Sequence, residues 1–188
     1  FKEEEILQAC AKIKPGKAAG LDGFTPDLAK VLVKQNVSFF KDLYNRLLKE
    51  NGFPREWKVA KLVLIENPKK EEEEDTKFRP ICLLNVSGKI YEHLILRRLT
   101  QEVENSGGLN TNQYGFTRGK TTIDVIQKIA NIVKIRRKYC AIILVDVKNA
   151  FNKASRKIIL RKLTRRNIPT YLINLSYTHL NHPTICSV

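Results

Sequence analysis

The stretch FRPICLLNVSGKIYEHLILRRL (residues 78–99) passes from one kind of secondary structure to another. Its first seven residues, 78–84, are apolar and β-rich, whereas the apolar side chains from residue 86 onward recur at helical spacing. A second β-rich run, KVAKLVLI (58–65), precedes it, and the link between the two runs contains a proline and five consecutive acids. Links of this kind are typically exposed. We therefore predict that 58–65 and 78–84 pair as antiparallel strands.

Helical periodicity predicts the other regular elements. Residues 3–13 combine helically spaced apolar side chains with acids in the first turn. Residues 26–50 indicate two helices that break near Asn36. The remaining predictions are loops in the Gly-rich stretches 14–24 and 107–120, and helices over residues 86–104, 121–138, 155–166 and 169–180.

The run YCAIILVDV (139–147) has the continuous apolar character of a strand buried on both faces. Asp146 closes this run, and a carboxylate in such a place needs an ionic or hydrogen-bonding partner. Carboxylate oxygens are also ligands that Mg²⁺ prefers. Asp146 is therefore a candidate metal ligand, and the alternative is that it caps the next element or pairs with Lys148.

The composition describes a chain that can build a core. It has 188 residues, of which 43 % are hydrophobic. We expect no membrane span, because no apolar run is long enough, and the acidic N-terminal stretch does not resemble a signal peptide. The chain begins at Phe1 and contains no methionine, so we expect it to be a fragment, a processed piece or the product of an incomplete gene model. Four widely separated cysteines without a CxxC pair indicate buried free thiols in a reducing compartment: Cys10, Cys82, Cys140 and Cys186.

The charge points toward a polyanionic partner. The formal net charge is +15, and residues 134–166 contain twelve basic residues against one acid. Basic clusters of this kind are common in nucleic-acid-binding proteins. The alternative is that they form only a solvated helix face.

Five stretches, in this order, resemble the reverse transcriptases of non-LTR retrotransposons. Any one of them alone would be weak, but together they cover nearly the whole chain. They are KAAGLDGF (17–24), which resembles KAPGPDGI; NGFPREWKVAKLVLI (51–65), which resembles GxxPxxWKxAxVxxI; residues 78–99, which resemble YRPISLLxxxxKxxExxIxxRL; NQYGFTRGKTTIDVI (112–126), which resembles QxGFRxGRSTxDAI; and ILVDVKNAFNKAS (143–155), which resembles DVxxAFDxV.

The resemblance implies an α/β fold of the α+β polymerase type. Residues 1–138 would form helix-rich fingers with an antiparallel strand pair, and residues 139–188 would begin a right-hand palm. The implied function is that of an RNA-directed DNA polymerase, which adds dNTPs to a primer 3′-hydroxyl with two Mg²⁺ (or Mn²⁺) ions. The implied partners are an RNA template, a DNA primer and a dNTP, and the implied location is intracellular, in the nucleus and cytoplasm. The alternative is a non-catalytic, nucleic-acid-binding remnant of a degenerate retroelement. The oligomeric state stays open.

The resemblance also assigns individual residues. Asp146 and the backbone carbonyl of Val147 would hold the metal, and Phe151 would exclude a ribose 2′-hydroxyl, with ordinary core packing as its alternative. Arg79 and Lys61 would contact the incoming triphosphate, although Lys61 fits equally well as a solvent-facing strand residue. The loop that supports the template and the nucleotide would consist of Gln113, Gly115, Phe116, Arg118 and Gly119, with Lys120 beside them as a further phosphate contact.

Several departures from the family pattern bear on activity. The first strand is followed by IENPKK in place of IPKP, and Asn152 stands where the family often has a second aspartate. An aromatic-x-Asp-Asp motif, which would supply the second catalytic carboxylates, is absent from the 188 residues, and we recognise no thumb. We therefore predict that residues 1–188 alone are inactive. His179, His182 and Cys186 fit no standard zinc module.

Overall fold

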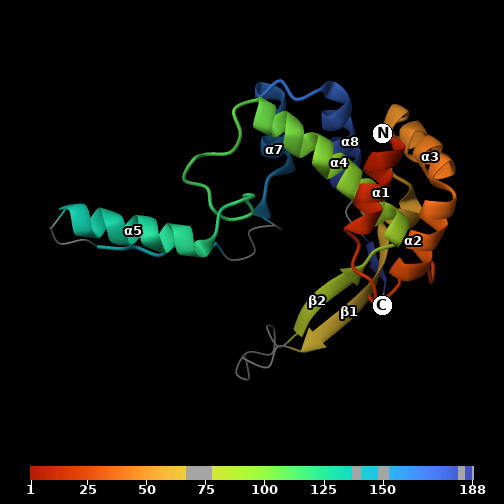
Figure 1. The fold of residues 1–188 in the computed structure, drawn as a ribbon, viewed down its shortest axis with the longest axis horizontal. Helices are drawn as coiled ribbons and strands as arrows, with labels where there is room; N and C mark the ends of the chain where they lie inside the picture. Colours follow the sequence, from red (N-terminus) through yellow and green to blue (C-terminus); the bar gives the residue numbers. More distant parts are fainter. Residues whose placement is uncertain (67–77, 137–140, 148–152, 182–184, 188) are drawn as a thin grey trace.

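The structure is a computed structural model, which describes residues 1–66, 78–136, 141–147, 153–181 and 185–187 (Figure 1). Helices dominate, and one small sheet lies at an edge of the molecule (Figure 1). The elements are α1 (Glu3–Ala11), α2 (Pro26–Gln35), α3 (Val37–Lys49), the short 3₁₀ helix η1 (Arg55–Trp57), β1 (Val59–Glu66), β2 (Phe78–Leu83), α4 (Val86–Asn105), α5 (Thr122–Arg136), α7 (Arg156–Arg165), α8 (Thr170–Asn181) and β3 (Ile185–Ser187).

The helix boundaries follow local signals in the sequence. Thr25 caps α2, because its hydroxyl accepts a hydrogen bond from the Leu28 amide at 3.3 Å, and Pro26 occupies the first helical position. The helix ends at Asn36, whose φ and ψ of −129° and 40° are not helical, and α3 starts directly after it. The predicted break near Asn36 is thus confirmed. The other helices predicted from the sequence are confirmed as well, as α1, α4, α5, α7 and α8.

The core lies where α1 to α4 meet. Its centre is aromatic: the rings of Tyr44 and Tyr91 stack with centroids 5.5 Å apart and an interplanar angle of 7°, and Trp57 and Phe53 pack around them. Both tyrosines are fully buried. Burial of a large apolar side chain contributes about 1.5–3 kcal/mol, so this cluster is a main source of stability for this part of the chain.

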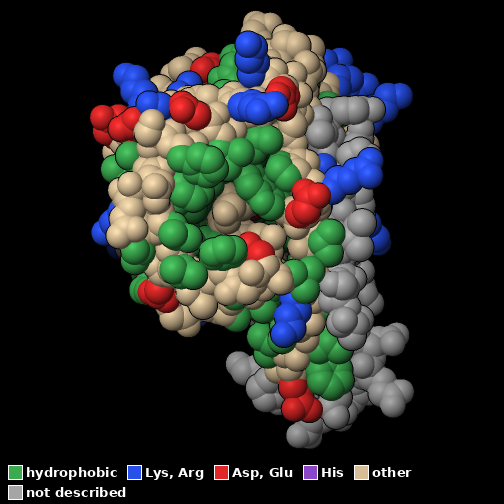
Figure 2. All heavy atoms as spheres, turned by 90° about the vertical axis from the view of Figure 1, so that its right-hand side faces the viewer, with side chains coloured by type: hydrophobic (Ala, Val, Ile, Leu, Met, Phe, Trp, Pro, Cys, Tyr) green, Lys and Arg blue, Asp and Glu red, His purple; other side chains and the backbone are tan. Residues whose placement is uncertain are grey.

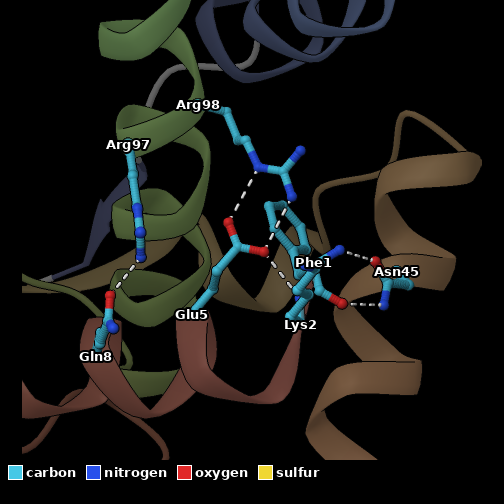
Figure 3. Close-up of polar contacts among 7 residues, drawn as sticks. All are labelled: Phe1, Lys2, Glu5, Gln8, Asn45, Arg97 and Arg98. Carbon is cyan, nitrogen blue, oxygen red and sulfur yellow. Dashed lines mark hydrogen bonds and ion pairs between the residues drawn. The ribbon is translucent and has the colours of Figure 1, made fainter.

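Polar contacts connect α1 to the neighbouring helices (Figure 3). Arg98 of α4 donates two hydrogen bonds to the Glu5 carboxylate, at 3.1 and 3.0 Å. Asn45 of α3 donates to the Phe1 carbonyl at 3.0 Å. A bidentate arginine–carboxylate pair fixes orientation as well as distance. These contacts therefore set the position of α1 against α3 and α4.

The sheet has three strands in the order β2-β1-β3. β1 and β2 pair antiparallel, with Lys61 opposite Leu83 and Glu66 opposite Phe78, which confirms the predicted strand pair. β3 was not predicted, and it pairs parallel to β1, with Val59 opposite Ile185. A three-residue strand leaves too short a periodic signal for sequence reasoning.

The Gly-rich loop of residues 14–24 is seated on the start of α4. An added Cβ at Gly20 would lie 2.8 Å from the backbone nitrogen of Asn85, which is closer than a Cβ comes to an atom to which it is not bonded. Asn85 in turn donates to the Glu56 carbonyl at 3.4 Å. Glycine at position 20 therefore permits contact between the loop and the β2–α4 junction.

The prediction of a buried strand at 139–147 is wrong for its described part. Residues 141–147 adopt no regular secondary structure, and Ile143, Leu144 and Val145 are between 85 % and 92 % exposed. A strand is stabilised by hydrogen bonds to a neighbouring strand and by burial of its side chains. In the described ranges no strand pairs with this segment, so its β-rich character finds neither form of stabilisation.

The expectation of free thiols is correct at one position and wrong at another. Cys10 is buried and free. Cys82 is disulfide-bonded, and the spacing of the cysteines in the sequence gives no signal of this bond. None of the described helices combines the length and the apolar character that a membrane span needs.

Candidate nucleic-acid interface

The loop before α5 is organised by a lysine. Lys120 Nζ donates to the carbonyl oxygens of Thr111 and Gln113, at 2.5 and 3.0 Å. Gln113 Nε2 donates to the Gly115 carbonyl at 3.1 Å. Lys120 thus stabilises the loop through hydrogen bonds from its ammonium group. The resemblance instead implied that this ammonium group contacts phosphate.

Aromatic and cationic residues both occur in this loop. Lys120 Nζ lies 4.9 Å from the centroid of the Tyr114 ring, and Lys128 Nζ of α5 lies 5.8 Å from it. Phe116 has a φ of 56° and is 97 % exposed. A non-glycine residue with positive φ is uncommon. Exposed aromatic rings beside cations are suited to stack on nucleic-acid bases while the cations contact phosphates.

The other two predicted loop residues, Arg118 and Gly119, are close in sequence but lie in different surroundings. Gly119 has a φ of 73°, which glycine adopts without strain and which turns the chain toward α5. Arg118 extends to a cleft between α1 and α4. The structure therefore places Gln113, Gly115 and Phe116 together at one turn, and Arg118 beside α1 and α4.

The first turn of α5 is capped by an Asp–Thr pair. The Asp124 carboxylate accepts hydrogen bonds from the Thr121 amide and hydroxyl, at 2.5 and 2.8 Å. The hydrogen bond from the Thr121 amide, followed by that from its hydroxyl, lowers the pKa of Asp124. Asp124 is thus occupied as a cap and is not positioned as a metal ligand.

The β1–β2 hairpin carries the two residues that the resemblance assigned to the triphosphate. Lys61 of β1 is exposed and lies opposite Leu83. Arg79 of β2 lies opposite Ile65, which is four residues along β1 from Lys61. Directly opposed residues share one face of a sheet, and so do residues four apart on a strand. Positions 61 and 79 therefore belong to the same face, separated by roughly 13 Å along the hairpin.

Asp146 lies apart from the hairpin. Figure 1 shows the segment 141–147 near the helix α5, which projects to the left, whereas β1 and β2 extend downward at the bottom of the view. The Asp146 carboxylate accepts a hydrogen bond from the Val147 amide at 2.9 Å, and both residues are exposed. Phe151, the predicted gate residue, lies outside the described residues, as do Lys148 and Asn152.

The described residues do not by themselves fit the pair of metal ions that the resemblance implies. Across the described ranges, no group of three or more His, Cys, Asp or Glu side chains is arranged to hold an ion. Asp146 contributes a single carboxylate, and a two-ion site needs carboxylates on more than one side.

Basic residues concentrate on α7 and near the cleft between α1 and α4. Arg166, just after α7, donates to the Gly108 carbonyl at 2.7 Å and so connects α7 to the loop that follows α4. Sequence reasoning missed Lys12 and Arg97 of the cleft, because one follows an acidic helix and the other occupies an ordinary helical position. Only the tertiary contact of α1 with α4 brings them together.

A different face is apolar. Hydrophobic side chains gather over α2 and α3 in Figure 2, and lysines and arginines lie mainly around the edges of this view. Leu28 and Val31 of α2 and Phe39 of α3 are between 47 % and 64 % exposed. The positive charge of the chain is therefore unevenly distributed over its surface, and the cleft and α7 are the stronger candidates for contact with a polyanion.

Comparisons with known proteins agree with the motif order. The family described as reverse transcriptase (RNA-dependent DNA polymerase) matches residues 67–186, which is more than half of the chain. This match includes β2, α4, the loop before α5 and the segment that carries Asp146.

Curated relatives from insects match along most of the chain. The chain is 28 % identical over 156 residues to a probable RNA-directed DNA polymerase from transposon BS of Drosophila melanogaster, which covers 81 % of the chain and 17 % of that protein. It is 28 % identical over 178 residues to the RNA-directed DNA polymerase from mobile element jockey of the same species, covering 93 % and 19 %. It is 27 % identical over 176 residues to a Pol polyprotein from the type-1 retrotransposable element R1 of Bradysia coprophila, covering 93 % and 17 %. The chain thus spans about a sixth to a fifth of the length of these relatives.

Proposed function

Because the chain belongs to the reverse transcriptase (RNA-dependent DNA polymerase) family and is related to the polymerases of non-LTR retrotransposons, we propose that it forms the template- and nucleotide-binding part of an RNA-directed DNA polymerase. Such an enzyme transfers the nucleotidyl group of a dNTP to a primer 3′-hydroxyl and releases pyrophosphate. Binding and orientation of the reactants account for much of the catalysis in phosphoryl transfer. The part of that work assigned to this chain is the holding of template, primer and triphosphate.

The observation that carries the proposal is the register of the β1–β2 hairpin. It puts positions 61 and 79, which are a lysine and an arginine in the sequence, on one face of adjacent strands. A guanidinium binds phosphate oxygens through two parallel hydrogen bonds, and an ammonium group adds a point charge. The proposed triphosphate contacts are therefore Arg79 and Lys61.

The template contacts of the proposal come from the loop before α5. Phe116 offers an exposed ring for base stacking, and Gln113, Gly115 and Gly119 shape the backbone that approaches the template. Arg118 adds a cation for phosphate. In this proposal residues 1–138 act as fingers and residues 139–188 as the start of a palm.

The proposed metal ligands are the Asp146 carboxylate and the Val147 carbonyl, and Phe151 is the proposed gate against ribonucleotides. A divalent ion would supply charge stabilisation to the reacting phosphate. Asp146 alone completes no two-ion site, so residues 1–188 by themselves are expected to bind nucleic acid without polymerising.

Binding is tested by filter retention of a primer–template at 50 and 200 mM salt. About four phosphate contacts would lower the affinity roughly a hundredfold over this range. A matched pair of variants, Lys61→Gln on the hairpin and Lys49→Gln on α3, tests the hairpin assignment. Retention of a labelled dNTP on the same filters should weaken in the first variant and stay unchanged in the second. Affinity that does not respond to salt would contradict the proposal.

Polymerisation is tested by dTTP incorporation on a poly-A template with a DNA primer and Mg²⁺. Residues 1–188 should give none, and robust incorporation would show that the catalytic carboxylates are assigned wrongly. A longer product of the same reading frame with a second carboxylate motif should be active, and Asp146→Asn should abolish that activity. An inactive longer product would favour the non-catalytic, nucleic-acid-binding remnant.

A further inference from the structure

A polar cleft of about 630 Å³ lies between α1 and α4 and is bordered by the loop before α5. Three cationic side chains line it from three different parts of the chain: Lys12 at the end of α1, Arg97 on α4, and Arg118 on the loop. Uncharged hydrogen-bonding side chains also line it, among them Gln8, Thr100 and Gln101. Such a lining binds an anion with several oxygens better than an apolar ligand.

The positive charge of the cleft is only partly compensated. Two acids line it, Glu5 and Glu104. Arg98 neutralises Glu5 through two hydrogen bonds, and it is not itself a lining residue (Figure 3). Glu104 is then the remaining acidic counter-charge to Lys12, Arg97 and Arg118.

Arg97 is held in place without losing its charge. Its guanidinium donates to the amide oxygen of Gln8 at 2.6 Å, and Figure 3 shows that Arg97 and the adjacent Arg98 reach different residues of α1. An amide fixes the guanidinium but does not neutralise it. The remaining donors of Arg97 are thus oriented at the edge of the cleft by a neutral partner.

The pKa of His93 depends on the charges in and around the cleft. It lines the cleft, and burial followed by the nearby charge of Lys12 lowers the pKa of its imidazole, against the opposing effect of Glu92. An anion in the cleft would favour the imidazolium and raise that pKa.

We propose that this cleft binds successive phosphate groups of a single nucleic-acid strand, through Lys12, Arg97 and Arg118. This inference rests on the proposed function and extends it, because Arg118 connects the cleft to the loop assigned to the template. The strand would thus continue from that loop across the surface formed by α1 and α4.

The test is fluorescence anisotropy with a labelled single-stranded RNA of about 15 nucleotides and the 188-residue chain. Arg97→Gln and Lys12→Gln are the decisive variants. Each should weaken binding about fivefold near 0.1 M salt and reduce the salt slope by about 0.7, the value for one lost phosphate contact on a single strand. Arg97→Lys should retain most of the affinity, and Glu104→Gln should increase it. Lys49→Gln on α3 is the matched control with the same loss of charge.

The outcomes separate the cleft from the proposed function. If the unaltered chain binds no RNA, the proposed function fails. If it binds RNA but Arg97→Gln and Lys12→Gln behave like Lys49→Gln, only the cleft assignment fails. If the cleft variants lose binding of inorganic triphosphate but keep that of RNA, the ligand is a free phosphate and the strand assignment is overturned.

A second readout distinguishes direct contact from a general charge effect. His93 is followed by NMR titration in the presence and absence of the RNA, with His93→Gln to assign its signal. Its pKa should rise when RNA binds, and this rise should be smaller in Arg97→Gln. An unchanged pKa of His93 at saturating RNA would overturn the proposal.

Discussion

The helical body formed by α1 to α4 and the region of residues 107–147 differ in the burial of their side chains. In the body, large side chains such as Tyr44, Tyr91 and Leu94 are fully buried. In the described part of 107–147, none of the characterised side chains is buried, although α5 is a regular helix of 15 residues. α5 thus has a regular helical backbone without a buried face, and burial would require a second surface to pack against.

The availability of a packing partner also explains why one apolar run forms a strand and another does not. The run 58–65 became a strand because 78–84 lies close enough to pair with it. The run 141–145 is even more apolar, but the described strands all pair elsewhere. Apolar character predicts that a segment gains from burial, whereas its neighbours decide whether burial is achieved.

The largest expected contrast is in amide hydrogen exchange. The amides of Ile90, Tyr91 and Leu94 in α4 should exchange at least about a thousandfold more slowly than those of residues 142–145, because the former open only with the body. Exchange read by mass spectrometry or NMR measures this ratio. Strong protection of residues 142–145 would show that they pair as a strand in solution.

A pair of leucine truncations tests the same contrast energetically. Leu94→Ala removes a fully buried side chain and should lower the free energy of unfolding by about 2–5 kcal/mol. Leu144→Ala removes a side chain that is 92 % exposed and should change it by less than about 0.5 kcal/mol. Urea denaturation of both variants provides the comparison, which fails if the two losses are similar.

Two glycines sharpen the comparison at the level of the backbone. Gly20→Ala should destabilise the chain by about 1–3 kcal/mol, because the new Cβ would meet the backbone of Asn85 at 2.8 Å. Gly115→Ala should be close to neutral, since an added Cβ there meets nothing within 4 Å. Thermal unfolding measures both, and a neutral Gly20→Ala would mean that the Gly-rich loop is not seated on α4.

The smallest expected effect concerns the Glu5–Arg98 pair. Burial by itself would raise the pKa of Glu5, but the hydrogen bonds from Arg98 and Lys2, together with nearby positive charges, lower it overall. A lowered folded-state pKa means that the stabilisation is complete above pH 4.5 and is lost as the pH falls through the folded value. Glu5→Gln should lower the free energy of unfolding by about 1 kcal/mol near pH 7 and remove the pH dependence that Glu5 causes.

The control for this pair is Glu50→Gln, which breaks an exposed pair with Arg46 on α3. Such a pair contributes little, so the change should stay within about 0.5 kcal/mol. Denaturation curves between pH 3 and 7 compare the two variants. Equal losses would show that α1 is not held against α4 by Glu5.

Sequence reasoning succeeded wherever the cause is local. The acids of α1, the break at Asn36 and the two β-rich strand runs each predict structure from a few adjacent residues. The family resemblance was also readable in this way, because its motifs are short stretches in a fixed order. These signals all depend on interactions within one turn of a helix or between two paired strands.

The tertiary structure decided everything that depends on distant segments. It placed β3 beside β1, brought Lys12, Arg97 and Arg118 to one cleft, used Lys120 to close its loop and left residues 141–147 exposed. The physical reason is that hydrogen bonds between strands, packing and charge clusters arise from groups brought close in space. Their energies depend on the partners that folding supplies, and the spacing of one segment does not encode those partners.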